Sequence, residues 1–151
     1  MEQGTKSDEA QGFRKLVAWQ RADELASRMF LTSREIARTD RWLASQVSRA
    51  AISVPANIAE GYGRGSLGDY MRFLDIARGS LAELEYYIHF LTKHGLIADA
   101  DASQASILRE ETGRLLRGLW QSLKVKDAST WDHSGGVHRI REDIAAYEED
   151  A

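Results

Sequence analysis

The sequence predicts an all-α protein, an antiparallel up-down four-helix bundle, on three observations. Apolar residues recur at helical spacing in four successive segments of the chain. The longest repeat takes steps of 3, 4, 3, 4, 3, 4 and 3 from Leu67 to Leu91, a heptad pattern that strands cannot explain. The segments between the four stretches are short, which is typical of antiparallel neighbouring helices.

The first predicted helix covers about residues 16–37, and Asp40 is placed to cap the second, which runs from about Arg41 to Glu60. Pro55, the only proline of the chain, lies inside this second helix. A proline there costs roughly 3 kcal/mol, because it lacks an N–H and its ring crowds the preceding turn. We therefore predict a helix kinked at Pro55, the alternative being two short helices that meet there. Gly61 is expected to end the helix as a left-handed cap.

Ser66, followed by Asp69, resembles a capping box for the third helix, which extends to about Lys93 before Gly95 ends it. Asp99 or Asp101 is expected to cap the fourth helix, which ends near residue 124. Several helices carry a second apolar flank that either widens the core or forms a subunit interface. Its members are Trp19, Phe30, Phe73, Ile76, Tyr87, Leu116 and Trp120.

Composition and charge divide the 151 residues into a flexible N-terminus over 1–12, the bundle over 13–125, and a linker with an acidic tail over 126–151. The tail has the pattern of one short helix. The net charge of −3 is uneven, because the two ends carry −2 and −4 while the bundle carries +3. The chain has no cysteine, which excludes disulfides and thiolate sites, and no apolar run approaches the roughly 20 residues of a membrane span. We expect a cytoplasmic protein.

No constellation predicts catalysis, a cofactor or a metal. Di-iron bundles use Glu-x-x-His pairs, whereas Glu85 and His89 stand four residues apart. No serine lies in a Gly-x-Ser-x-Gly turn. The glycines of residues 61–65 resemble a phosphate loop only weakly, because they follow a helix and not a strand. The sequence therefore does not indicate an enzyme.

Four arginines on or between the second and third helices are the remaining candidates, as contacts to nucleic-acid phosphate: Arg49, Arg64, Arg72 and Arg78. Arginine suits bidentate contacts to phosphate. The alternative is that local carboxylates bind these arginines in solvated or structural ion pairs. Asn57 and Glu60 follow the proline, and Ser53 or Asn57 is expected to satisfy backbone groups around the kink.

Three ordered motifs carry a resemblance to a known family. They are VAWQRA at 17–22, QVSRAAISVPANIAEG at 46–61 and RFLDIARGSLAELE at 72–85. Over about residues 13–123 the chain resembles the four-helix-bundle proteins that are encoded in intervening sequences of bacterial large-subunit ribosomal RNA genes. The same family includes the accessory variability protein of diversity-generating retroelements. Matching motif positions are Arg49, Pro55, Asn57, Glu60, Gly61, Arg64, Arg72, Ser80 and Glu83.

The resemblance implies a bundle that assembles into a homopentameric ring. In the retroelement branch the ring binds a reverse transcriptase and its RNA through a basic surface, so the expected partners are RNA or DNA, a reverse transcriptase and further copies of the chain. This chain differs from that branch in its net acidity and in its acidic extension. A scaffold that binds proteins through the ring surface or the acidic tail, without nucleic acid, is the alternative.

Overall fold

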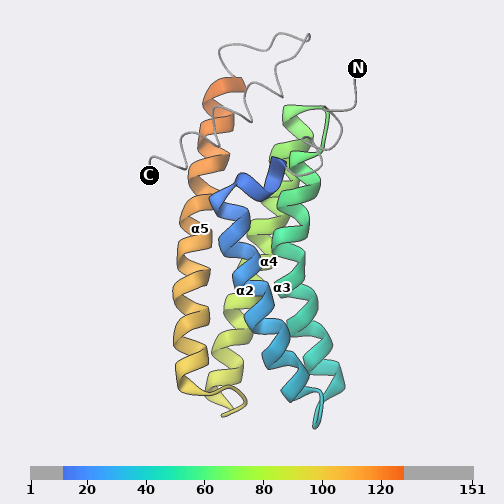
Figure 1. Ribbon diagram of the computed structural model, residues 1–151, viewed down its shortest axis with the longest axis vertical. Helices are drawn as coiled ribbons and strands as arrows, with labels where there is room; N and C mark the ends of the chain where they lie inside the picture. The colour runs from blue at the N-terminus through green and yellow to red at the C-terminus, as the bar shows by residue number, and fades with distance from the viewer. Residues whose placement is uncertain (1–11, 128–151) are drawn as a thin grey trace, which may run out of the picture.

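The computed structural model describes residues 12–127, which form a short 3-10 turn and four α-helices. The turn η1 spans Gly12–Lys15, and the helices are α2 (Val17–Ile36), α3 (Arg41–Tyr62), α4 (Leu67–Lys93) and α5 (Asp99–Asp127). The helices alternate in direction along the bundle, so that the α3–α4 connection lies at one end and the α2–α3 and α4–α5 connections at the other (Figure 1). The predicted all-α, antiparallel up-down bundle is confirmed.

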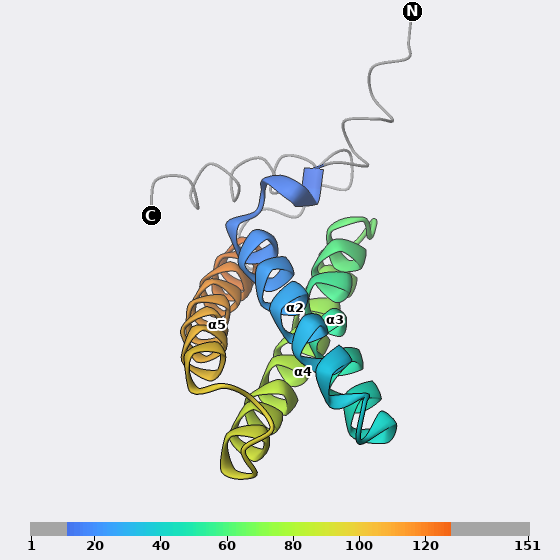
Figure 2. The same ribbon diagram turned by 60° about the horizontal axis from the view of Figure 1, so that its bottom comes forward.

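Each helix of the bundle packs against two others: α2 contacts α3 and α5, and α4 contacts the same two helices. In Figure 2, α5 accordingly lies beside α2 on the side away from α3. The turn η1 packs on α2 and α3. The heptad residues predicted for α4 are all buried: Leu67, Tyr70, Leu74, Ala77, Leu81, Leu84, Ile88 and Leu91.

Side-chain and backbone caps define the helix ends. The Asp40 carboxylate accepts from the Leu43 N–H at 2.9 Å, and the Ser66 hydroxyl accepts from the Asp69 N–H at 3.2 Å, as predicted. Gly95, at φ 65°, ends α4 in a Schellman motif, in which the Leu96 N–H bonds to the Leu91 carbonyl at 2.8 Å.

The prediction that Asp99 or Asp101 caps α5 is wrong. Asp99 is the first residue of the helix, and both carboxylates lie within its first turn. The backbone carbonyl of Ala98 accepts the Ala102 N–H at 2.9 Å, so the helix starts one residue earlier than a cap at Asp99 requires. Negative charge in the first turn still stabilises the helix through its dipole.

α3 continues without interruption through Pro55, which excludes two short helices that meet there. The predicted kink stays a prediction. The expectation of a left-handed cap at Gly61 is wrong, because Gly61 lies inside α3 and the helix ends at Tyr62. Gly61 is instead a point of close approach between helices, since a Cβ there would stand 2.8 Å from the Phe73 Cβ and 3.0 Å from Tyr70 Cδ2.

The second apolar flank divides between core and surface. Phe73 and Leu116 are buried, which widens the core. Phe30 and Ile76 remain 43% and 42% exposed. Trp19, Tyr87 and Trp120 are partly buried against the core.

Two of the predicted domain boundaries differ from the structure. Gly12 is buried in η1 and so belongs to the folded part, and residues 126–127 extend α5. The rest of the predicted N-terminus, and the predicted linker, short helix and acidic tail, lie outside the described residues.

Candidate nucleic-acid interface

Arg64 and Arg72 lie against the same aromatic ring. The connection after α3 carries Arg64 and the first turns of α4 carry Arg72, and their guanidinium carbons stand 4.6 and 5.0 Å from the centroid of Phe73. Each also forms an ion pair with a carboxylate three or four residues before it, Arg64 with Glu60 and Arg72 with Asp69 at 3.8 Å. Tertiary structure thus brings together two arginines that stand eight residues apart in the sequence.

Arg78 takes part in a second cluster of the same kind, between α4 and α5. Its guanidinium is 3.0 Å from the Asp75 carboxylate and 5.7 Å from the centroid of Trp120. The ammonium of Lys124 lies 5.2 Å from the same ring. Cation–π attraction to one indole thus helps to position both cations, and Arg78 is also held by its ion pair.

Arg49 stands apart from the other three arginines. It lies in the half of α3 nearer Arg41, where it donates a hydrogen bond to Gln46 at 2.8 Å. Tyr87 lies nearby and donates to Glu83 at 3.1 Å. Burial, the hydrogen bond to Glu83 and its negative charge raise the pKa of Tyr87 above the ordinary value, and the positive charge of Arg49 opposes that shift.

The family motif around Pro55 forms a polar seam between α3 and α4. Asn57 donates to the Ser53 carbonyl at 2.7 Å and to its hydroxyl at 2.9 Å. The Ser53 hydroxyl also shares a 2.8 Å hydrogen bond with Ser80 on α4. Asn57 thus bonds to a backbone carbonyl near the proline, as expected, whereas the Ser53 hydroxyl bonds to the side chains of Asn57 and Ser80 and links the two helices.

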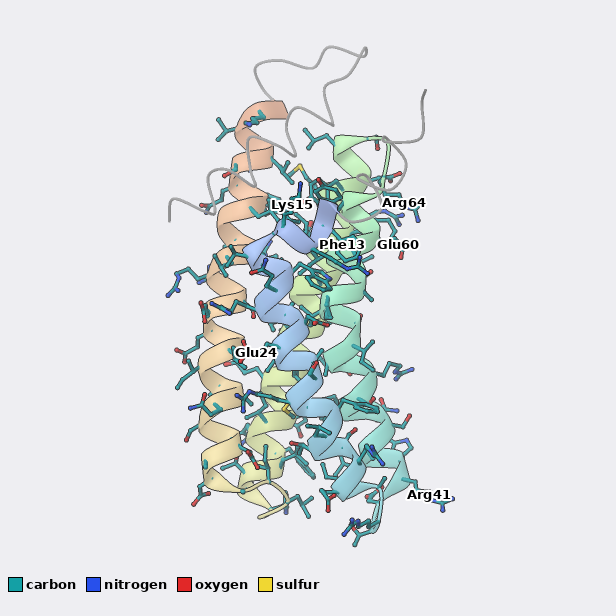
Figure 3. The ribbon with its side chains drawn as sticks, in the orientation of Figure 1. Phe13, Lys15, Glu24, Arg41, Glu60 and Arg64 are labelled. Carbon is teal, nitrogen blue, oxygen red and sulfur yellow. The ribbon has the colours of Figure 1, made fainter. Side chains whose placement is uncertain are left out.

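Positive charge is concentrated at one end of the bundle. The half that holds the α3–α4 connection, residues 12–26, 52–79 and 113–127, has ten basic and six acidic residues, a net charge of +4. The other half, residues 27–51 and 80–112, has seven basic and eight acidic residues, a net charge of −1. Figure 3 shows Lys15 and Arg64 toward the first end, which we call the basic end, and Arg41 at the opposite one.

The sequence did not indicate Arg117 and Lys124 of α5 as members of the basic end, and it indicated Trp120 only as part of the second apolar flank. Their signal in the sequence is the spacing of 3 and 4 residues, which places them on one side of a helix. That signal did not show which helix would lie opposite, so it did not connect them with Arg78.

Within residues 12–127, no group of three or more His, Asp or Glu side chains is arranged to hold a metal ion. None of the helices in that range is long and apolar enough to span a membrane.

The chain matches the family model described as 23S rRNA-intervening sequence protein over residues 14–118. A crystal structure of a protein of unknown function from the S23 ribosomal protein family of Bacteroides thetaiotaomicron is similar to it, with a TM-score of 0.65 and 23% sequence identity. That similarity covers 69% of this chain and 98% of the other, and it supports the fold alone. No curated protein matches. Because the family model spans most of the helical bundle, the chain belongs to the 23S rRNA-intervening sequence protein family.

Proposed function

We propose that this protein is a non-enzymatic, oligomeric accessory protein that binds nucleic acid, specifically RNA, as part of a ribonucleoprotein. The resemblance to the retroelement branch implies a reverse transcriptase as the protein partner in such a particle. It also implies a homopentameric ring as the assembly. The observation that carries the nucleic-acid part is the basic end, where Arg64, Arg72 and Arg78 lie next to aromatic rings.

The ion pairs of these arginines do not prevent phosphate binding. Arg72 and Arg78 have side chains that are 64% and 42% exposed, and their carboxylate partners are similarly exposed. Exposed ion pairs of this kind contribute only about 0–1 kcal/mol each. A phosphate that accepts two hydrogen bonds from a guanidinium therefore competes with a single carboxylate.

Fluorescence anisotropy of labelled structured RNA, titrated with the protein across a salt series, tests the proposal. We expect micromolar or tighter binding, and the logarithm of the association constant should fall linearly with the logarithm of the salt concentration. The double variant Arg64→Glu/Arg72→Glu should weaken binding about tenfold or more and make the slope shallower. Arg34→Glu/Arg41→Glu is the matched control, since it makes the same change of four charges in the other half of the bundle.

Absence of binding by the wild-type protein at low salt would refute the nucleic-acid proposal. Equal loss of affinity in Arg34→Glu/Arg41→Glu would mean that net charge, and not the basic end, governs binding.

Exposed apolar residues on α3 and α4 support the oligomeric part of the proposal. Trp42 and Ile52 on α3 are 70% and 47% exposed, and Ile76 and Tyr86 on α4 are 42% and 59% exposed. Within each pair the residues are ten apart, about 2.8 helical turns, so they lie on one side of their helix. Exposed apolar residues on two neighbouring helices are consistent with a protein interface.

Light scattering and native mass spectrometry test this assembly. We expect a homopentamer for the wild-type chain and dissociation in Ile76→Glu. Ile107→Glu on α5, where the wild-type isoleucine is 56% exposed, is the control and should leave the mass unchanged. A monomeric wild-type protein would refute the assembly.

The same exposed apolar residues favour a second candidate function, a protein scaffold that acts without nucleic acid. In that case a partner protein covers Trp42 and Tyr86, and the salt titration detects no RNA binding. Deletion of residues 126–151 should then abolish capture of the partner if the acidic tail recruits it.

A further inference from the structure

A charged groove runs between α4 and α5 at the edge of the basic end. It has a volume of about 360 Å³, and three arginines from the two helices line it: Arg78, Arg109 and Arg117. Gly79 and Gly113 also line it, which leaves backbone where other residues would project a side chain. The Arg117 guanidinium reaches over Gly113, with Nη1 3.6 Å from where a Cβ would stand.

One side of α5 continues this groove along the bundle. Arg109, Gly113, Arg117, Trp120 and Lys124 follow one another at steps of 4, 4, 3 and 4 residues, which keeps them on one side of the helix. From the first to the last they span about 22 Å at the rise of an α-helix. This row of residues, which we call the track, begins in the groove and extends beyond its lining residues to Trp120 and Lys124.

The carboxylates of the groove neutralise part of this track and leave the rest positive. Arg109 pairs with Glu85 across the helix interface at 3.0 Å, and Arg78 pairs with Asp75. Arg117 and Lys124 form no ion pair with any side chain in the described part of the chain. Both are exposed and so are available to an anion.

We infer that this groove holds the sugar–phosphate backbone of single-stranded RNA, with Arg117 and Lys124 as its main phosphate contacts. The inference rests on the proposed function and assigns a path to the bound strand. A positive groove beside an aromatic side chain is the usual site for a single strand. A base-paired RNA helix keeps its bases stacked inside, whereas a single strand can place unstacked bases against an aromatic side chain.

Glu85 limits the affinity of the groove, because it occupies the guanidinium of Arg109. Its side chain is 57% exposed while that of Arg109 is 23% exposed, so the carboxylate lies on the solvent side of the pair. Without this charge Arg109 keeps only the 4.0 Å pair with Glu110, whose side chain is 73% exposed, so its guanidinium can bind a further phosphate.

Anisotropy titrations with a fluorescein-labelled oligouridylate of about 20 nucleotides test the path. The double variant Arg117→Glu/Lys124→Glu should bind about tenfold or more weakly, with a salt slope shallower by about 1.4, since two phosphate contacts on a single strand are lost. Its control is Arg34→Glu/Arg41→Glu, which makes the same charge change in the other half of the bundle and should bind more tightly than the groove variant.

A variant that gains affinity also tests the groove, because a misfolded protein would lose affinity and not gain it. Glu85→Gln should bind severalfold more tightly, with a slope steeper by about 0.7. Its control is Glu35→Gln, which breaks the local pair with Arg38 near the end of α2 and should bind as the wild type does.

The outcomes separate this inference from the proposed function. If Arg64→Glu/Arg72→Glu weakens binding while the Arg117 and Lys124 variant and Glu85→Gln behave as wild type, the groove is overturned and the proposed function stands. If a duplex of the same length binds as tightly and with the same sensitivity to Arg117 and Lys124, the single-strand assignment is overturned. If the wild-type chain binds neither probe, both proposals fail.

Discussion

Replacement of Gly61 by alanine should destabilise the protein, although alanine is the better helix former. Inside α3 the substitution gains about 1 kcal/mol of helix propensity. The new Cβ, however, would stand 2.8 Å from the Cβ of Phe73 and 3.2 Å from the backbone carbonyl oxygen of Tyr70. Neither atom can move away by rotation of a side chain, so α3 and α4 must separate. Overpacking of this kind costs about 1–3 kcal/mol, and we expect its upper end here, a net loss of about 2 kcal/mol.

Thermal unfolding followed by circular dichroism measures the effect. For a chain of this size 1 kcal/mol corresponds to roughly 2–4 °C, so Gly61→Ala should lower Tm by about 4–8 °C. The matched control is Gly118→Ala in the interior of α5, where a Cβ would meet nothing within 4 Å. It should raise Tm by about 2–4 °C, because only the propensity gain remains. A Tm for Gly61→Ala at or above wild type would refute the close-approach explanation.

Three further predictions concern stability. Asn57→Ala should destabilise the protein by about 1 kcal/mol in urea titrations, because Ser53 loses both hydrogen bonds from the amide; an unchanged midpoint would contradict this. The free energy of unfolding of Trp120→Phe should lie within about 1 kcal/mol of the wild-type value, because the indole N–H is buried without a hydrogen-bond partner. Trp120→Ala should lower it by about 3 kcal/mol, and equal losses in the two variants would refute this explanation. Because the pKa of Tyr87 is raised in the folded state, the contribution of its neutral phenol to stability is complete below the unfolded pKa of about 10 and is lost as pH rises through the folded pKa. Tyr87→Phe should therefore lose less stability at alkaline pH than the wild type does. An identical dependence of stability on pH in the two proteins would contradict this.

The buried residues of α4 illustrate how much local pattern can predict. The heptad from Leu67 to Leu91 identifies the helix and its buried face, because burial of one face follows directly from residue spacing. The caps at Asp40, Ser66 and Gly95 were equally predictable, since each depends on side-chain or backbone chemistry within a few residues.

Gly61 shows where local pattern is insufficient. A glycine near the end of a helical stretch has two physical uses, a left-handed cap and a close contact with another helix. The sequence contains nothing that distinguishes them, because the second depends on Phe73 and Tyr70 of the neighbouring helix.

The sequence by itself determined four helices, the caps at Asp40, Ser66 and Gly95, the buried faces and the family, because these depend on spacing and on contiguous motifs. Only the tertiary structure decided which charges share a surface. It placed Arg64 and Arg72 on one ring, set Arg49 apart from them, and joined Arg78 of α4 to Trp120 and Lys124 of α5. The reason is that the candidate site is built across helix interfaces, and the register between two helices follows from how their side chains pack and not from either sequence alone.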